Sequence, residues 1–155
     1  MIIAAGFSYM ASEDYVIYID GSSKGNPGPS GIGLVIFNKN ETNKPLEEIT
    51  RFIGEATNNI AEYEALIWAL KWLINNRIES ATIKMDSALV FNQLTGNYRV
   101  KSPQMAGLYR RVKRLMSQVK NISLKLIPRD ENKMANRLAQ RATRKNKFKK
   151  QILIK

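Results

Sequence analysis

Two acidic residues stand directly after short apolar segments of the sequence. Asp20 follows the apolar residues 16–19, and Asp86 follows the largely apolar residues 81–85. Both segments are typical of buried strands. A carboxylate beside apolar neighbours is costly to ionise unless a positive group compensates its charge, and a divalent metal ion is one candidate. For Asp20 a second interpretation stays open, because Asp also favours the start of a turn and residues 21–31 are rich in Gly, Pro, Ser and Asn.

A third carboxylate, Glu62, could join this pair from the first turn of a predicted helix. If the two strands are parallel neighbours, about 4.8 Å apart, their carboxyl ends meet at one edge of a sheet. Mg²⁺ suits a cluster of carboxylate oxygens, and two ions about 4 Å apart could clamp the attacking and leaving oxygens of a phosphodiester. The alternative for Glu62 is structural, since Asn59 and Glu62 have the spacing of a helix capping box.

The composition excludes several kinds of site. The 155 residues contain no Cys and no His. This excludes zinc sites built from thiolates or imidazoles, Ser-His and Cys-His nucleophiles, and a histidine general base. The length indicates a single domain, residues 1–155. The sequence has no Cys, no signal peptide and no apolar run long enough to span a membrane, so we expect a monomeric cytoplasmic protein.

The charge is divided unevenly along the chain. Residues 1–98 carry 7 basic and 11 acidic side chains, a net charge of −4, whereas residues 99–155 carry 18 and 2, a net charge of +16. A basic half is typical of proteins that bind nucleic acid. A charged surface that serves only solubility is the alternative.

The hydrophobic periodicity predicts an α/β domain. Three strands come first, and helices and single strands follow, which indicates a mixed sheet with helices on both faces. Residues 1–14 would form an N-terminal arm, residues 144–155 a basic C-terminal tail, and residues 151–155 a short strand or a frayed end. The predicted strands are 15–20, 31–38, 47–53, 81–86 and 122–127, and the predicted helices are 59–76, 87–94, 103–119 and 132–143.

Four segments, in this order, resemble type 1 ribonucleases H. They are Tyr18-Ile19-Asp20-Gly21-Ser22-Ser23 with Gly25-Asn26-Pro27-Gly28, Thr57-Asn58-Asn59-Ile60-Ala61-Glu62-Tyr63, Met85-Asp86-Ser87, and Pro128-Arg129-Asp130-Glu131-Asn132 continuing to Ala139. The resemblance implies the ribonuclease H-like fold, with a five-stranded mixed sheet in the order 3-2-1-4-5. It also implies cleavage of the RNA strand of RNA/DNA hybrids with two Mg²⁺ or Mn²⁺ ions. Only residues 95–101 join the second and third helices, so the likeness is to archaeal-type members that lack a basic handle.

The same resemblance implies a set of metal ligands. Asp20, Glu62 and Asp86 match three of the four metal-binding carboxylates of the family, and Asn136 stands where the fourth is usually Asp. Asn keeps a carbonyl oxygen for a hard cation but lacks the negative charge, so we expect weaker binding of the second ion. Asp130 and Glu131 could compensate for the missing charge, or could serve only the N-terminus of the last helix.

Further positions are implied to contact the hybrid. Asn26, Asn58 and Asn59 match residues that reach ribose 2′-hydroxyls and base edges, the groups that distinguish RNA from DNA. Thr57 and, less specifically, Gln104 match residues at a phosphate of the DNA strand. Two alternatives remain at this stage. One is a hybrid-binding module whose catalysis is weakened or lost through Asn136, and the other is a transposase- or integrase-like member of the fold.

Overall fold

The computed structural model describes the backbone of residues 14–154 and the side chains of residues 14–144, so the predicted arm lies outside the described residues except for Asp14. The elements follow the predicted order. No helix within residues 14–154 has the length and apolar character needed to cross a membrane. The elements are β1 (Tyr15–Ser23), β2 (Gly28–Asn38), β3 (Glu47–Ala56), α2 (Asn58–Asn75), β4 (Ser80–Met85), α3 (Ala88–Leu94), α4 (Pro103–Met116), β5 (Asn121–Leu126), a short 3₁₀ helix η1 (Arg129–Glu131) and α5 (Lys133–Ile154).

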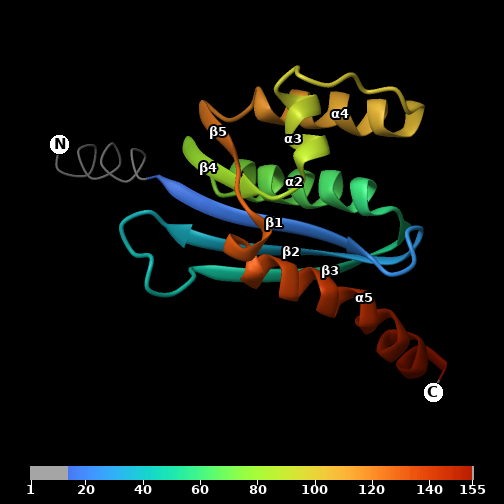
Figure 1. The fold of residues 1–155 in the computed structure, drawn as a ribbon. Coiled ribbons are helices and arrows are strands. Elements are labelled where there is room, and N and C mark those ends of the chain that lie inside the picture. Colours follow the sequence, from blue (N-terminus) through green and yellow to red (C-terminus); the bar gives the residue numbers. More distant parts are fainter. Residues whose placement is uncertain (1–13, 155) are drawn as a thin grey trace.

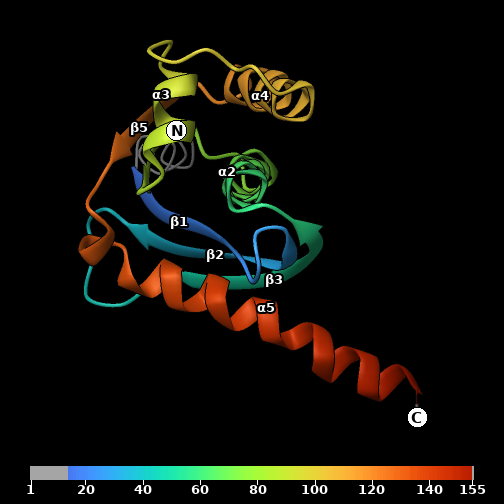
Figure 2. The same cartoon turned by 45° about the vertical axis from the view of Figure 1, so that its right-hand side comes forward.

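The five strands form one mixed sheet in the order β3-β2-β1-β4-β5, as the resemblance implied. β1 pairs antiparallel with β2 and parallel with β4, and β4 pairs parallel with β5. Figures 1 and 2 show α2 on one face of this sheet and α5 on the other, with α3 and α4 packed outside α2. The prediction of helices on both faces is therefore confirmed.

The main core lies between the sheet and α2. The alternating residues Ile17 and Ile19 of β1 are fully buried there. The apolar stripe of α2 meets them and includes Tyr63, Leu66 and Leu70, all buried as the helical spacing predicts. The apolar side of α4 also packs on this core, with Val112 fully buried.

The opposite face of the sheet brings α5 unusually close to β2. A Cβ atom at Gly31 would lie 2.3 Å from the Cβ of Ala142, and one at Gly33 would lie 2.4 Å from the carbonyl oxygen of Ala135. Only glycine, which has no side chain, allows this approach. Since Gly33 pairs with Asp20 across the β1–β2 ladder, the first turns of α5 lie beside Asp20.

Several predicted boundaries are wrong: β2 begins at Gly28 and not at residue 31, β3 ends at Ala56 and not at residue 53, and α4 ends at Met116 and not at residue 119. Two further differences bear on the site. β1 continues to Ser23, and Asp20 pairs with Gly33 inside the strand, so Asp20 does not begin a turn. The last helix does not end near residue 143, because α5 continues to Ile154 through the predicted tail and through residues 151–154 of the possible strand. Residues 133–154 contain no Gly or Pro and are rich in good helix formers, so nothing in the local sequence stops the helix.

The contact between β1 and α2 leads to a test with a matched control. A Cβ atom at Gly21 would lie 2.2 Å from the carbonyl carbon of Ala61, whereas one at Gly107 in α4 meets nothing within 4 Å. We expect Gly21→Ala to lower the free energy of unfolding by about 1–3 kcal/mol, because backbone must shift. Gly107→Ala should raise it by about 0.5–1 kcal/mol through helix propensity. Urea unfolding measures both, and equal effects of the two substitutions would contradict the close contact.

Candidate active site

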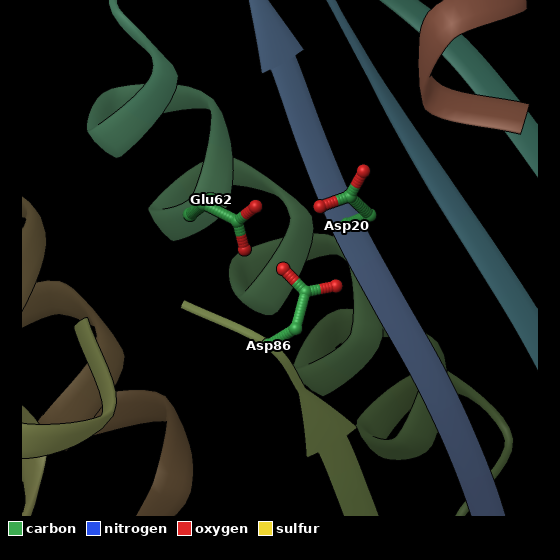
Figure 3. Close-up of side chains that lie close together, drawn as sticks. All are labelled: Asp20, Glu62 and Asp86. Carbon is green, nitrogen blue, oxygen red and sulfur yellow. The ribbon is translucent and has the colours of Figure 1, made fainter. Parts of the chain in front are cut away.

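Three carboxylates converge at the edge of the sheet where β4 ends. Asp20 comes from β1, Glu62 from α2 and Asp86 from the loop after β4, and Figure 3 shows the three side chains pointing toward one another. One carboxylate oxygen from each lies within 4.8 Å of the others. The parallel register explains the meeting: Tyr18 pairs with Lys84, so Asp20 and Asp86, each two residues further on, stand at the same level. The predicted convergence is confirmed.

Glu62 is held by β1 and does not cap its helix. The backbone N–H of Gly21 donates to Glu62 Oε1 over 3.1 Å. The N-cap of α2 is Thr57, whose side chain accepts a hydrogen bond from the N–H of Ile60. The capping-box alternative for Asn59 and Glu62 is therefore wrong, because Glu62 is buried against the sheet and its carboxylate is turned to Gly21.

Asp86 is held by two residues near the start of α5. The Asn132 side chain donates from Nδ2 to Asp86 Oδ2 over 2.7 Å and to the Ile19 carbonyl over 2.8 Å. Arg129 Nη1 lies 3.7 Å from Asp86 Oδ1. These roles of Asn132 and Arg129 were not predicted from the sequence. The role of Asn132 could have been predicted from its position. It is a polar residue at the start of an apolar helix face, and a polar side chain that is buried there needs hydrogen-bond partners.

Asp130 and Glu131 do not join the cluster. Both are exposed in η1, and among the residues that the structure describes the close carboxylate group consists of Asp20, Glu62 and Asp86. Nor do they lie in the first turn of α5, because both belong to η1 and Asn132 stands between them and the helix. The idea that they supply a fourth negative charge at the cluster is not supported by this geometry.

Four buried oxygen atoms near the start of α5 and in the cluster have no hydrogen-bond donor among the described residues. Asp20 Oδ1, Glu62 Oε2, Asn132 Oδ1 and Asn136 Oδ1 are buried, and none of them accepts a hydrogen bond from the described part of the chain. Asn136 lies one turn after Asn132, directly after Ala135, whose carbonyl touches Gly33 beside Asp20. Buried acceptors are normally satisfied, and hard cations bind carboxylate and amide oxygens. The carboxylate oxygens of Asp20, Glu62 and Asp86 therefore form a donor set that fits a hard divalent cation.

The raised pKa values of the cluster are also consistent with a cation site. Burial raises the pKa of the Asp20 carboxyl from 3.8 to about 6, and the charge of Asp86 adds to this rise, while hydrogen bonding with Glu62 and the charge of Arg129 oppose it. Burial and the adjacent Asp20 also raise the pKa of Glu62 well above its ordinary value. A bound cation would remove this penalty by favouring the ionised carboxylates.

The shifted pKa predicts how the stability of the metal-free protein depends on pH. Between about pH 4 and pH 6 the unfolded chain loses the Asp20 proton while the folded protein keeps it, so stability should fall as pH rises through this window. The difference between 3.8 and 6 corresponds to roughly 3 kcal/mol. Urea unfolding in EDTA across this range measures the fall, and Asp20→Asn should remove the part due to Asp20 and leave the part due to Glu62, whose pKa is also raised. A fall of the same size in that variant would contradict the assignment.

A groove beside the cluster contains part of the predicted substrate-binding set. Its volume is about 290 Å³, and its lining residues are Gly21, Ser22, Asn58, Asn59, Glu62, Asp86, Ser87 and Arg129. Asn26 lies next to it, because its Oδ1 accepts from the N–H of Asn58. Thr57 caps α2, and Gln104 is exposed in the first turn of α4. Neither Thr57 nor Gln104 lines this groove.

Comparison with known proteins gives consistent matches. A family model described as reverse transcriptase-like matches residues 18–142. The chain is 41% identical over 127 residues to bifunctional protein Rv2228c of Mycobacterium tuberculosis, covering 82% of this chain and 35% of that protein. It is 36% identical over 125 residues to ribonuclease HI of Halobacterium salinarum, covering 81% of this chain and 62% of that protein. The chain thus spans about a third of the first relative and less than two thirds of the second.

Solved structures agree with these matches. The crystal structure of ribonuclease H1 from Halobacterium salinarum superposes with a TM-score of 0.79 at 35% identity, covering 83% of this chain and 96% of that one. LC11-ribonuclease H1 in complex with an RNA/DNA hybrid gives a TM-score of 0.78 at 38% identity, covering 85% and 98%. The sheet order and the carboxylate cluster point the same way, and the chain belongs to the type 1 ribonuclease H family.

Proposed function

We propose that this protein is an endoribonuclease that cleaves the RNA strand of RNA/DNA hybrids by metal-dependent phosphodiester hydrolysis. The observation that carries the proposal is the convergence of Asp20, Glu62 and Asp86 within 4.8 Å, together with buried oxygens that lack donors. A chain without His or Cys has few other means of activating water. The cytoplasmic location expected from the absence of cysteine is part of the proposal.

Asp20, Glu62, Asp86 and Asn136 would hold two Mg²⁺ or Mn²⁺ ions. Such ions, when bound, make water nucleophilic at neutral pH and stabilise the charge on the leaving oxygen. The other residues keep these ligands in place. Asn132 holds Asp86 to β1, the Gly21 N–H orients Glu62, and the Arg129 guanidinium offsets part of the negative charge. Asn136 contributes an oxygen without charge, so the second ion would bind less tightly.

The substrate is supported by polar side chains near the groove. Asn58 and Asn59 line the groove and Asn26 is bonded to Asn58, so three amides lie where ribose hydroxyls could be recognised. Thr57 and Gln104 are proposed to contact a phosphate of the DNA strand. The basic half of the chain would supply the long-range attraction for a polyanion. The relative solved with a hybrid supports the same substrate class.

The test is a cleavage assay with end-labelled substrates. The purified protein is incubated with an RNA/DNA hybrid, single-stranded RNA, duplex RNA and duplex DNA, in Mg²⁺, in Mn²⁺ and in EDTA. We expect cleavage of the hybrid RNA strand alone, with 5′-phosphate products, and no cleavage in EDTA. Cleavage of duplex DNA would instead indicate a transposase- or integrase-like activity.

A second candidate function is a module that binds the hybrid but does not cleave it. The uncharged side chain of Asn136 at the fourth ligand position is the observation that favours it. Tight binding of the hybrid with no cleavage at any Mg²⁺ or Mn²⁺ concentration would overturn the nuclease proposal and support this candidate.

A further inference from the structure

A second pocket adjoins the groove of the carboxylate cluster. It has a volume of about 220 Å³ and lies between the β1–β2 hairpin and α5. Both pockets are lined by Ser22, so they adjoin at that residue. We name it the Lys24–Arg144 pocket, and its lining residues are Ser22, Ser23, Lys24, Gln140, Thr143 and Arg144.

Lys24 and Arg144 line the same pocket because α5 lies close to the sheet. Ser22 pairs with Gly31 across the β1–β2 ladder, and a Cβ atom at Gly31 would lie 2.3 Å from the Cβ of Ala142. The residues that follow Ala142, namely Thr143 and Arg144, therefore lie at the end of the hairpin. Figures 1 and 2 show α5 running past the β1–β2 hairpin.

The hairpin holds its side of the pocket in place. The Lys24 N–H donates to the carbonyl of Pro29 over 2.9 Å. The Ser23 hydroxyl donates to the Ala56 carbonyl over 2.7 Å, and the Ser23 N–H donates to Asn58 Oδ1 over 2.8 Å. Asn58 also lines the groove of the carboxylate cluster. The position of Lys24 is thus coupled to the site where the substrate is proposed to bind.

The chemistry of the pocket is suited to a phosphate. Lys24 and Arg144 are both exposed, and neither side chain forms an ion pair with an acidic residue of the described chain. No acidic residue lines the pocket. An ammonium and a guanidinium together offer several charge-assisted donors, which is the arrangement that phosphate oxygens accept. The groove is lined by carboxylates, which suit metal ions, and the adjacent pocket is lined by cations, which suit phosphates of a nucleic-acid backbone.

We propose that the Lys24–Arg144 pocket binds a backbone phosphate of the hybrid, outside the metal cluster and on the α5 side of the groove. The proposal rests on the function proposed above, since it assumes that the hybrid lies in the adjoining groove. The pocket would fix how far the duplex extends across the β1–β2 hairpin. Free phosphate has the same chemistry, and the experiment separates the two sources.

The experiment measures hybrid affinity without turnover. Fluorescence anisotropy of a labelled RNA/DNA hybrid is recorded in EDTA at several salt concentrations for the wild type, Lys24→Gln, Arg144→Gln and the double variant. Loss of one phosphate contact should weaken binding about tenfold at 50 mM salt in the double variant and reduce the slope of log K against log[salt] by about 0.9.

Two exposed cations at the other end of the sheet serve as controls. Lys44 lies in the loop after β2, and Arg77 follows the C-terminal end of α2. Lys44→Gln and Arg77→Gln make the same charge changes far from the hairpin, so both should leave the slope unchanged. Thermal unfolding of each variant shows whether it is folded.

The outcomes separate failure of the pocket proposal from failure of the proposed function. If the wild type cleaves the hybrid and the double variant binds it with wild-type affinity and slope, the pocket proposal is overturned while the proposed function stands. A wild-type protein that does not bind the hybrid overturns both. If inorganic phosphate at matched ionic strength stabilises the wild type but not the double variant, and the hybrid slope does not change, the pocket takes free phosphate and the backbone proposal is wrong.

Discussion

Asp20→Asn should abolish hybrid cleavage and, at neutral pH without metal, make the protein more stable. The substitution removes a buried negative charge from the centre of the cluster while keeping its shape. Loss of about 4 kcal/mol of metal-dependent stabilisation corresponds to a rate reduction on the order of 10³-fold. The gain in stability follows from the pKa of about 6, since the folded metal-free protein no longer has to ionise a buried carboxyl. It should approach roughly 3 kcal/mol.

Asp14→Asn is the matched control for this prediction. Asp14 lies immediately before the other end of β1, where its carboxylate is 3.5 Å from Lys39 Nζ and accepts a hydrogen bond from the Ser80 hydroxyl. The same chemical change there should leave cleavage unaffected and should not raise stability. Cleavage rates in saturating Mg²⁺ and urea unfolding in EDTA measure both effects. Full activity of Asp20→Asn would refute the proposed metal site.

Asn136→Asp should have the opposite pair of effects. A fourth carboxylate would strengthen cation binding, because the affinity of oxygen-ligated sites rises with the charge of their ligands. We expect the Mg²⁺ concentration for half-maximal cleavage to fall about tenfold or more. Without metal, a further charge at a buried position that is 8% exposed should destabilise the folded protein. A Mg²⁺ titration of activity and urea unfolding in EDTA test the two effects.

Asn132→Asp provides the contrast. It adds the same charge one turn earlier on the chain, but it removes the amide that donates to Asp86 and to the Ile19 carbonyl. It should therefore lower activity at every Mg²⁺ concentration, because a buried carbonyl and a metal ligand lose their donor. An unchanged Mg²⁺ dependence in Asn136→Asp would mean that Asn136 is not a ligand.

These opposite effects describe one physical compromise. The carboxylates needed to bind a cation are costly to bury without it, so the site lowers the stability of the metal-free protein. Asn136 reduces that cost by one charge, and the expected consequence is weaker binding of the second ion. Added Mg²⁺ should recover stability in the wild type, since a ligand that binds only the folded state stabilises it.

The order and type of the elements follow from local patterns in the sequence. The apolar run that precedes Asp20 and the three- and four-residue spacing in α2 depend on neighbours along the chain. They predicted a strand and a helix with buried faces, and both elements are present. The ends of elements were predicted less well. α5 continues past residue 143 because no local signal stops it, whereas β1 passes Asp20 because pairing with β2 continues to Ser23.

The partners of the polar residues depend on distances that no local pattern contains. Glu62 has the spacing of a capping residue, yet it accepts from Gly21, forty-one residues away, because a glycine there lets α2 touch β1. Asn132 reaches Asp86, and Arg144 reaches the hairpin of Lys24, because Gly31 and Gly33 let α5 lie directly on β2. Residue types and spacing thus predicted the carboxylates and their chemistry, while close backbone contacts between distant elements determined which groups orient them.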